Sequence, residues 1–277
     1  YYQNAGEFWA MRKNILILCV MIPILVIMTD ILMKRSQVSC LSENTCETAE
    51  FREQHLSGRL YEELSGSGNF ADDLTVTMLH GKFSPDEIWT DSVLYRKYKP
   101  TEYFRLRKAY QAVWFDLKYF PIADNGHSGD KISFENTYGA SRTYGGQRIH
   151  EGCDLFGEKK QSGYYPVLSM TDGTVEKIGW LPLGGYRIGI RASYGGYFYY
   201  AHLSGYEKEF KEGDPVEAGE ILGYMGNTGY GEEGTAAMFP VHLHLGIYIE
   251  TPNHKELSVN PYWVLKAISK KIRNCSY

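Results

Sequence analysis

Apolar residues form one long run near the start of the chain. Every position from Ile15 to Met28 is apolar or small apart from Pro23, and a shorter apolar stretch follows it. A helix that crosses a bilayer core needs about 17–25 such residues. Because basic residues flank the run on both sides, the pattern predicts a transmembrane anchor over residues 11–35.

The direction of this anchor does not follow from its flanks. The basic residues nearly balance across the run, with Arg12 and Lys13 before it and Lys34 and Arg35 after it. A cleaved signal peptide is the alternative, but no small-residue cleavage site follows and basic residues stand where cleavage is expected. The stretch that begins at Met11 resembles a natural start, so we expect residues 1–10 to be an upstream addition.

Apolar positions at helical spacing dominate residues 47–120. Two stripes recur every four residues, and a broader face follows Thr101: Leu56, Leu60 and Leu64; Phe70, Leu74 and Met78; Tyr103, Leu106, Tyr110, Val113, Trp114 and Leu117. This spacing predicts a small helical region whose apolar faces pack on one another or on the next domain. Ser84, Pro85 and Glu87 have the pattern of a capping box, so we expect a further helix to begin there.

The composition changes after a connector at residues 121–136, which is rich in Pro, Gly and Asp. In residues 137–266 short β-type runs alternate with glycine turns, and no helical period separates them: YYPVLSM, GTVEKIGW, YRIGIRAS, GYFYYAHL, EILGYMG and VHLHLGIYIE. This rhythm predicts a mainly β domain, an antiparallel sheet or sandwich, before a tail at residues 267–277.

Charge and cysteine content exclude some classes of protein. The formal net charge is −4 and the sequence pI is about 6.1, so the chain lacks the basic surface that nucleic-acid binding needs. Five cysteines are too few and too scattered for a disulfide scaffold, although Cys40 and Cys46 are placed to close a short loop in an oxidising space.

Two histidines stand one residue apart within the last β-type run. Side chains alternate faces along a strand, so His242 and His244 share one face and can meet one ion or one substrate. Upstream, His150 and Asp154 are four residues apart and are flanked by flexible glycines. Histidine and carboxylate are good zinc ligands, and catalytic zinc sites keep three protein ligands and one open position. His150, Asp154 and one member of the pair would make that set.

The other histidines comprise one candidate site residue and four residues without an expected role in the site. His202 ends an aromatic run, YFYYAH, and we expect it near the same pocket, either as a functional residue or as a hydrogen-bonded strand end. The remaining histidines stand in helical or connector settings and are expected at the surface: His55, His80, His127 and His254.

These motifs together resemble the lysostaphin/LytM-type zinc metallopeptidases, the β-lytic metalloendopeptidase family. The matching segments are HEGCD at 150–154, YYAHLSG at 199–205, the hairpin EGDPVEAGEILGYMGNTGY and HLH at 242–244. They follow the family order over residues 145–263. The sequence departs from the better-known secreted enzymes in the longer, acidic loop at 227–240, which we expect to wall the groove.

The resemblance implies a LytM-like antiparallel sheet with a groove over one zinc ion. It implies His150, Asp154 and His244 as zinc ligands and His202 and His242 as catalytic residues that face the substrate. It also implies a bacterial peptidoglycan endopeptidase that cleaves a cross-bridge or stem peptide, held at the cell membrane by a single span with its C-terminal domain outside the cytoplasm. The helical region would then space the peptidase from the membrane or cover its groove.

A second reading comes from another class of protein. Members of this family without metal residues act as scaffolds or activators, so the chain would use the LytM-like fold to bind a cell-wall enzyme or membrane partner. The complete ligand set argues against this alternative, whereas the anchor and the helical region suit an assembly role. A zinc amide hydrolase with another substrate is a third reading.

Overall fold

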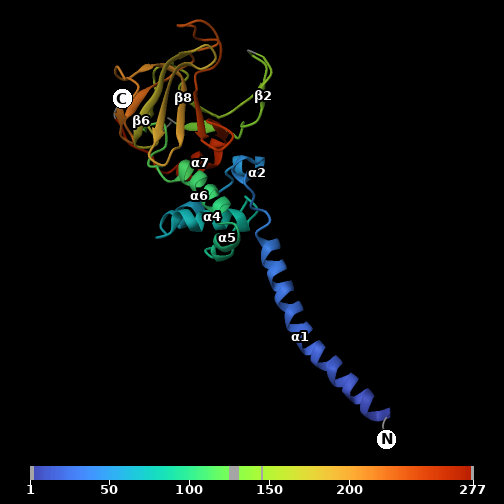
Figure 1. The fold of residues 1–277 in the computed structure, drawn as a ribbon. Coiled ribbons are helices and arrows are strands. Elements are labelled where there is room, and N and C mark those ends of the chain that lie inside the picture. The colour runs from blue at the N-terminus through green and yellow to red at the C-terminus, as the bar shows by residue number, and fades with distance from the viewer. Residues whose placement is uncertain (1–2, 125–130, 145, 276–277) are drawn as a thin grey trace.

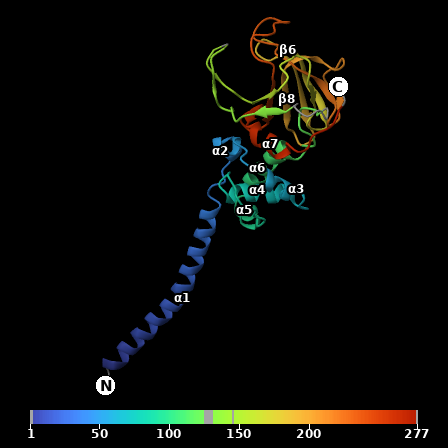
Figure 2. The ribbon, with the colours of Figure 1, turned by 180° about the vertical axis from the view of Figure 1, so that it is seen from behind.

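The computed structural model describes residues 3–124, 131–144 and 146–275. His127 and Gly145, which figure in the sequence analysis, lie outside the described residues. The chain has three parts that follow one another in space, namely a long N-terminal helix, a cluster of short helices and a β-sheet (Figure 1). The same order is seen from behind (Figure 2), so the short helices lie between the long helix and the sheet.

The long helix, α1 (Gln3–Gln37), projects away from the rest of the chain. Its segment Phe8–Gln37 is long and apolar enough to cross a membrane, and none of its most apolar window is buried. By length and composition it fits a membrane anchor or a signal sequence equally. Pro23 lies within the helix without ending it.

Short helices make up the region between residues 45 and 114. Their bounds are η1 (Thr45–Glu47), α2 (Ala49–Arg52), α3 (Gly58–Ser65), α4 (Phe70–His80), α5 (Val93–Tyr98) and α6 (Pro100–Trp114). The expected apolar stripes face inward, since Leu60, Leu74 and Tyr110 are almost fully buried. Helical spacing therefore identified the core of this region correctly.

The capping box expected at Ser84 is wrong. No helix begins there, because the Ser84 hydroxyl hydrogen-bonds the ring of His55 at 2.8 Å instead of capping a backbone amide. The following segment is held by tertiary contacts, since Thr77 Oγ1 bonds both the N–H and the carbonyl oxygen of Trp89 at 3.0 Å. Cys40 and Cys46 are free, with Cys46 buried, so they do not close the loop that their spacing allows.

The rest of the described chain forms a mainly antiparallel β domain, as expected. A 10-stranded sheet has the main order β1-β4-β11-β8-β7-β6-β9, with β10 beside β5 and β8 and with β12 beside β11. Its strands are β1 (Ile132–Phe134), β4 (Cys153–Gly157), β5 (Pro166–Leu168), β6 (Gly173–Leu181), β7 (Gly185–Ala192), β8 (Tyr197–Tyr206), β9 (Pro215–Val216), β10 (Ile221–Met225), β11 (Leu243–Ile249) and β12 (Leu257–Val259).

Two strands stand apart from the main sheet as an arm. They are β2 (Ser141–Arg142) and β3 (Arg148–Ile149), which pair only with each other. Figure 1 shows this arm curving out beside the sheet. Each of the six runs expected from sequence contains a strand, whereas the arm and the shortest strands carry too few alternating positions to be recognised.

One hydrophobic core joins the helical region to the sheet. Trp114 at the end of α6 donates its indole N–H to Gln54 at 2.7 Å, and Gly196 lies so close to α6 that a Cβ there would be 2.0 Å from the carbonyl oxygen of Ala112. The last helix, α7 (Pro261–Ile268), packs on α3. The residues after it return to the end of the helical region, where the Phe120 N–H bonds the carbonyl of Lys271 at 2.8 Å.

Candidate active site

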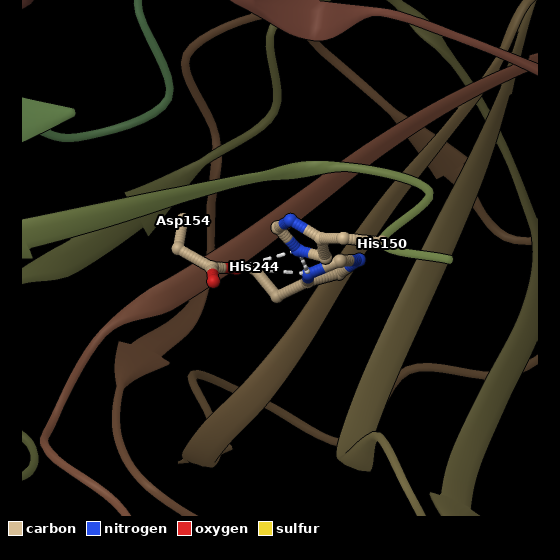
Figure 3. A group of neighbouring side chains, drawn as sticks. All are labelled: His150, Asp154 and His244. Carbon is tan, nitrogen blue, oxygen red and sulfur yellow. Dashed lines mark hydrogen bonds and ion pairs between the residues drawn. The ribbon is translucent and has the colours of Figure 1, made fainter. Parts of the chain in front are cut away.

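Three ligand-type side chains meet where β4 and β11 lie side by side. Asp154 on β4 and His244 on β11 are direct partners in the antiparallel register. His150 follows the arm strand β3 and precedes β4, and it is almost fully buried. Figure 3 shows the three side chains pointing at one another.

The three facing atoms are nearly equidistant. His150 Nε2 lies 3.0 Å from His244 Nδ1 and 3.1 Å from Asp154 Oδ1, and His244 Nδ1 lies 3.0 Å from Asp154 Oδ1. A tetrahedral zinc ion with bonds of ~2.0–2.1 Å holds its ligand atoms about 3.3 Å apart. The spacing of the two nitrogens and one oxygen therefore fits a single small metal ion.

The groups around the trio fix which atoms face inward. The carbonyl oxygen of Thr137 lies 3.1 Å from His150 Nδ1 and can only accept, so this nitrogen carries the proton and Nε2 keeps its lone pair. Arg142 on the arm donates to Asp154 Oδ2 at 3.0 Å, which leaves Oδ1 for the trio. The same guanidinium approaches His150 Nδ1, but a protonated nitrogen cannot accept its hydrogen bond.

His202 and His242 border the same trio, with their rings 4.8 Å apart between centroids. His202 Nδ1 donates to the carbonyl of Thr228 at 2.8 Å, and His242 Nδ1 donates to the carbonyl of Pro240 at 2.8 Å. Each ring therefore keeps an unprotonated Nε2 for other work. His242 Nε2 lies 3.7 Å from Asp154 Oδ1, outside the close group.

Burial favours the neutral form of these histidines. It lowers the pKa of His202 to about 3, and the nearby His242 and His244 act in the same direction. Burial likewise lowers the pKa of His242 and of His244. Burial alone would raise the pKa of Asp154, but the neighbouring rings of His150, His244 and His242 hold it well below its usual range. At neutral pH the site is a carboxylate among neutral imidazoles, which is the protonation state that metal ligands need.

His202 occupies a strained bulge and does not end its strand. β8 continues to Tyr206, while His202 has a φ of 63°, a conformation uncommon for residues other than glycine. The β7–β8 register shifts here, and the His202 N–H bonds the carbonyl of Gly184 at 2.8 Å. Bulges re-aim side chains next to functional sites, and this one turns a strand residue towards the trio.

A groove of about 950 Å³ surrounds the trio and both flanking histidines. Its described lining lies between Arg142 and Glu256, so none of the helical region at 47–120 borders it. The loop at 227–240 does wall it, as expected, through Tyr230 and Phe239. Tyr144 of the arm stacks on Tyr230 with ring centroids 4.0 Å apart, so the arm and the loop meet beside the groove.

Sequence reasoning missed the groove's aromatic and basic floor. Tyr197 and Tyr199 on β8, Tyr248 on β11 and Arg187 on β7 all line it. Tyr197 and Tyr199 alternate with the buried Phe198 and Tyr200, and this two-residue period was the available signal.

Of the histidines expected at the surface, His80 and His254 are exposed and His55 is half-buried.

An antiparallel sheet that gathers two histidines and an aspartate in a groove defines a protein with a candidate single-metal centre. The model of peptidase family M23 matches residues 148–261, which include the trio and both flanking histidines. A crystal structure from Ruminococcus gnavus ATCC 29149, assigned as a glycyl-glycine endopeptidase LytM, is 41% identical with a TM-score of 0.76. The match covers 87% of this chain and 98% of that one. The chain belongs to peptidase family M23, whose members are metallopeptidases.

Two curated relatives carry different substrate names. An L-Ala–D-Glu endopeptidase of Bacillus subtilis (strain 168) is 41% identical over 169 residues, which are 60% of this chain and 48% of the relative. The glycyl-glycine endopeptidase ALE-1 of Staphylococcus capitis is 32% identical over 117 residues, 39% of this chain and 31% of the relative. The chain thus spans about half or less of the length of these relatives.

Proposed function

We propose that the chain is a zinc endopeptidase with His150, Asp154 and His244 as the zinc ligands. The observation that carries the proposal is the convergence of His150 Nε2, Asp154 Oδ1 and His244 Nδ1 within 3.0–3.1 Å of one another. Zinc bound there would polarise the scissile carbonyl and lower the pKa of a water molecule towards about 7. Thr137 and Arg142 hold the ligands in place from behind.

His242 and His202 are the proposed catalytic residues. Each is fixed by an Nδ1–H bond to a backbone carbonyl, and each is neutral at pH 7 because burial lowers its pKa. One Nε2 can therefore take a proton from the attacking water and return it to the leaving amine. The other ring also keeps an unprotonated Nε2, which can accept a hydrogen bond from the attacking water and help to orient it.

Peptidoglycan is the proposed substrate, since both curated relatives are named as endopeptidases of peptide units of the kind found in bacterial walls. We further propose that α1 anchors the chain in the cell membrane with residues 36–277 outside the cytoplasm. The helical region then serves as a spacer rather than a cover, because the described lining of the groove comes from other residues.

The alternative is a scaffold that binds a partner without hydrolysis. The two readings differ in metal content and in turnover. The full chain, purified in detergent and assayed for metal, is expected to hold one zinc ion per molecule. It should cut purified muropeptides into fragments that mass spectrometry identifies. Stoichiometric zinc with no cleavage of any muropeptide would favour the scaffold, and a chain that binds no zinc would refute the enzyme.

A further inference from the structure

Arg187 stands in the row of residues that crosses the sheet at the metal-ligand trio. Asp154 pairs with His244, and His244 pairs with Ala201 on β8. On β7, Tyr186 faces Leu203 and Ile188 faces Tyr200 of β8. Arg187 stands between these two residues, so it lies opposite Ala201 and His202 at the bulge. Arg187 and Ala201 both line the groove. Between His244 and Arg187 this row contributes only the methyl group of Ala201, which is fully buried.

The guanidinium of Arg187 has no partner within the described part of the chain. Its Nη1 is buried and makes no hydrogen bond, and the described residues supply no ion pair to it. The other cations of the groove have partners: Arg142 is paired with Asp154 and Lys177 with Glu256, and Arg148 donates to the Tyr144 carbonyl and the Tyr230 hydroxyl. An arginine is always charged, and a buried N–H without an acceptor costs free energy. Such a group therefore indicates a site where a ligand supplies the missing acceptor.

The surroundings make Arg187 a strong anion anchor. Tyr197 and Tyr199 lie within reach of its charge: burial raises the pKa of both phenols, and the Arg187 charge opposes that rise. Both phenols stay neutral and offer no negative charge of their own, and the Nη1 atom of Arg187 is buried. Charge-assisted hydrogen bonds gain strength in such a setting, and a guanidinium matches the two oxygens of a carboxylate.

We propose that Arg187 binds a carboxylate of the substrate, so that the groove selects an acidic peptide. This inference rests on the proposed function and adds the substrate class. Arg187 lies two strands from His244, about 9–10 Å across the sheet. An extended peptide advances about 3.3 Å per residue, so the carboxylate belongs within about three residues of the scissile bond. A stem-peptide unit with a free glutamate carboxyl meets this requirement, and a glycine bridge does not.

A pair of matched peptides tests the proposal. Both contain an L-Ala–D-Glu unit, one with the free glutamate carboxyl and one with that carboxyl amidated, and pentaglycine serves as a third ligand. Dissociation constants are measured by calorimetry on the zinc-free full chain in detergent, where no hydrolysis interferes. Rates are then measured on the zinc-loaded chain. The variants are Arg187→Gln, Arg187→Lys and, as a control in the same groove, Lys177→Gln, whose charge Glu256 already neutralises.

The parent chain is expected to bind the acid about 10- to 100-fold more tightly than the amide. Arg187→Gln should abolish this preference, Arg187→Lys should keep part of it, and Lys177→Gln should keep it all. A parent without the preference, or a preference that survives in Arg187→Gln, overturns the inference even if the chain hydrolyses peptides. A preference that depends on Arg187 in a chain that cleaves none of the peptides upholds the inference and refutes the proposed function instead.

Discussion

Asp154 and His244 lie directly opposite each other on neighbouring strands although 90 residues separate them, and their facing atoms are 3.0 Å apart. Because strand side chains alternate, a register shift of one residue would send His244 to the other face of the sheet. The register of β4 against β11 therefore sets the spacing of the proposed metal ligands. The site is built into the sheet and does not depend on a mobile loop for these two residues.

The five site residues are expected to divide into two groups on substitution. His150→Ala, Asp154→Ala and His244→Ala each remove one of three converging atoms and should lose both zinc and hydrolysis. His202→Ala and His242→Ala should keep near-stoichiometric zinc and lose about 10²–10⁴-fold in rate, the usual contribution of general acid–base catalysis. Metal analysis and muropeptide cleavage measure the two properties. Zinc lost in His242→Ala but kept in His244→Ala would reverse the roles.

Acid is expected to destabilise the zinc-free protein before its carboxylates titrate. The folded pKa of His202 is about 3, below the ordinary value of about 6.5 that the unfolded chain has. Between these values the unfolded chain binds more protons, so the free energy of unfolding falls as the pH falls. His202 alone should account for about 3 kcal/mol of loss by pH 4.

Denaturant unfolding at pH 4 to 7 checks this expectation. His242 and His244 add to the slope, since burial lowers the pKa of each as well. His202→Asn removes only the share of His202, and asparagine tolerates the positive φ at this position better than most residues. A variant whose stability depends on pH as steeply as that of the parent would contradict the assigned burial effect.

Much of the β domain and of the site was accessible from the sequence. The alternation in VHLHLGIYI placed His242 and His244 on one face, and the structure brings both beside Asp154. The family pattern supplied His150 and Asp154 together. These residues are readable because a strand encodes its faces in every second position.

Other features depend on contacts between distant segments, which spacing does not encode. The Ser84 hydroxyl hydrogen-bonds the His55 ring and does not cap a helix, and Thr77 hydrogen-bonds the backbone of Trp89. The bulge at His202 arises from the register of β7 against β8, and Arg187 Nη1 lacks a hydrogen-bond partner among the described residues. Such features form only when distant segments of the chain come together, so no local sequence pattern predicts them.

Tight packing between α6 and the sheet gives a direct test of the shared core. A Cβ at Gly196 would lie 2.0 Å from the carbonyl oxygen of Ala112, so Gly196→Ala must push α6 away from β8. We expect a loss of about 1–3 kcal/mol in the free energy of unfolding. A Cβ at Gly205, on the strand β8 that follows Gly196, meets nothing within 4 Å, so Gly205→Ala should cost nothing measurable. Equal stability of the two variants would show that α6 does not pack as described.

Truncation is expected to separate the roles of α1 and of the helical region. Removing residues 1–35 takes away an exposed helix, so 36–277 should remain folded and zinc-competent while losing its association with membranes. Flotation with lipid vesicles, metal analysis and thermal melting measure these properties. A 36–277 chain that still floats with vesicles would show that α1 is not the anchor.

Removing residues 1–119 should instead damage the site at a distance. Arg52 on α2 donates to the Tyr138 hydroxyl and to Ser258 Oγ, both at 2.8 Å, and Tyr138 adjoins Thr137, whose carbonyl orients His150. The shorter chain 120–277 therefore exposes part of the shared core and lacks the contacts of Arg52. We expect it to unfold at a lower temperature and to bind zinc about 10- to 100-fold more weakly. Arg52→Ala in 36–277 should reproduce part of the loss in zinc affinity. Full zinc affinity and higher activity in 120–277 would mean that the helical region covers the groove.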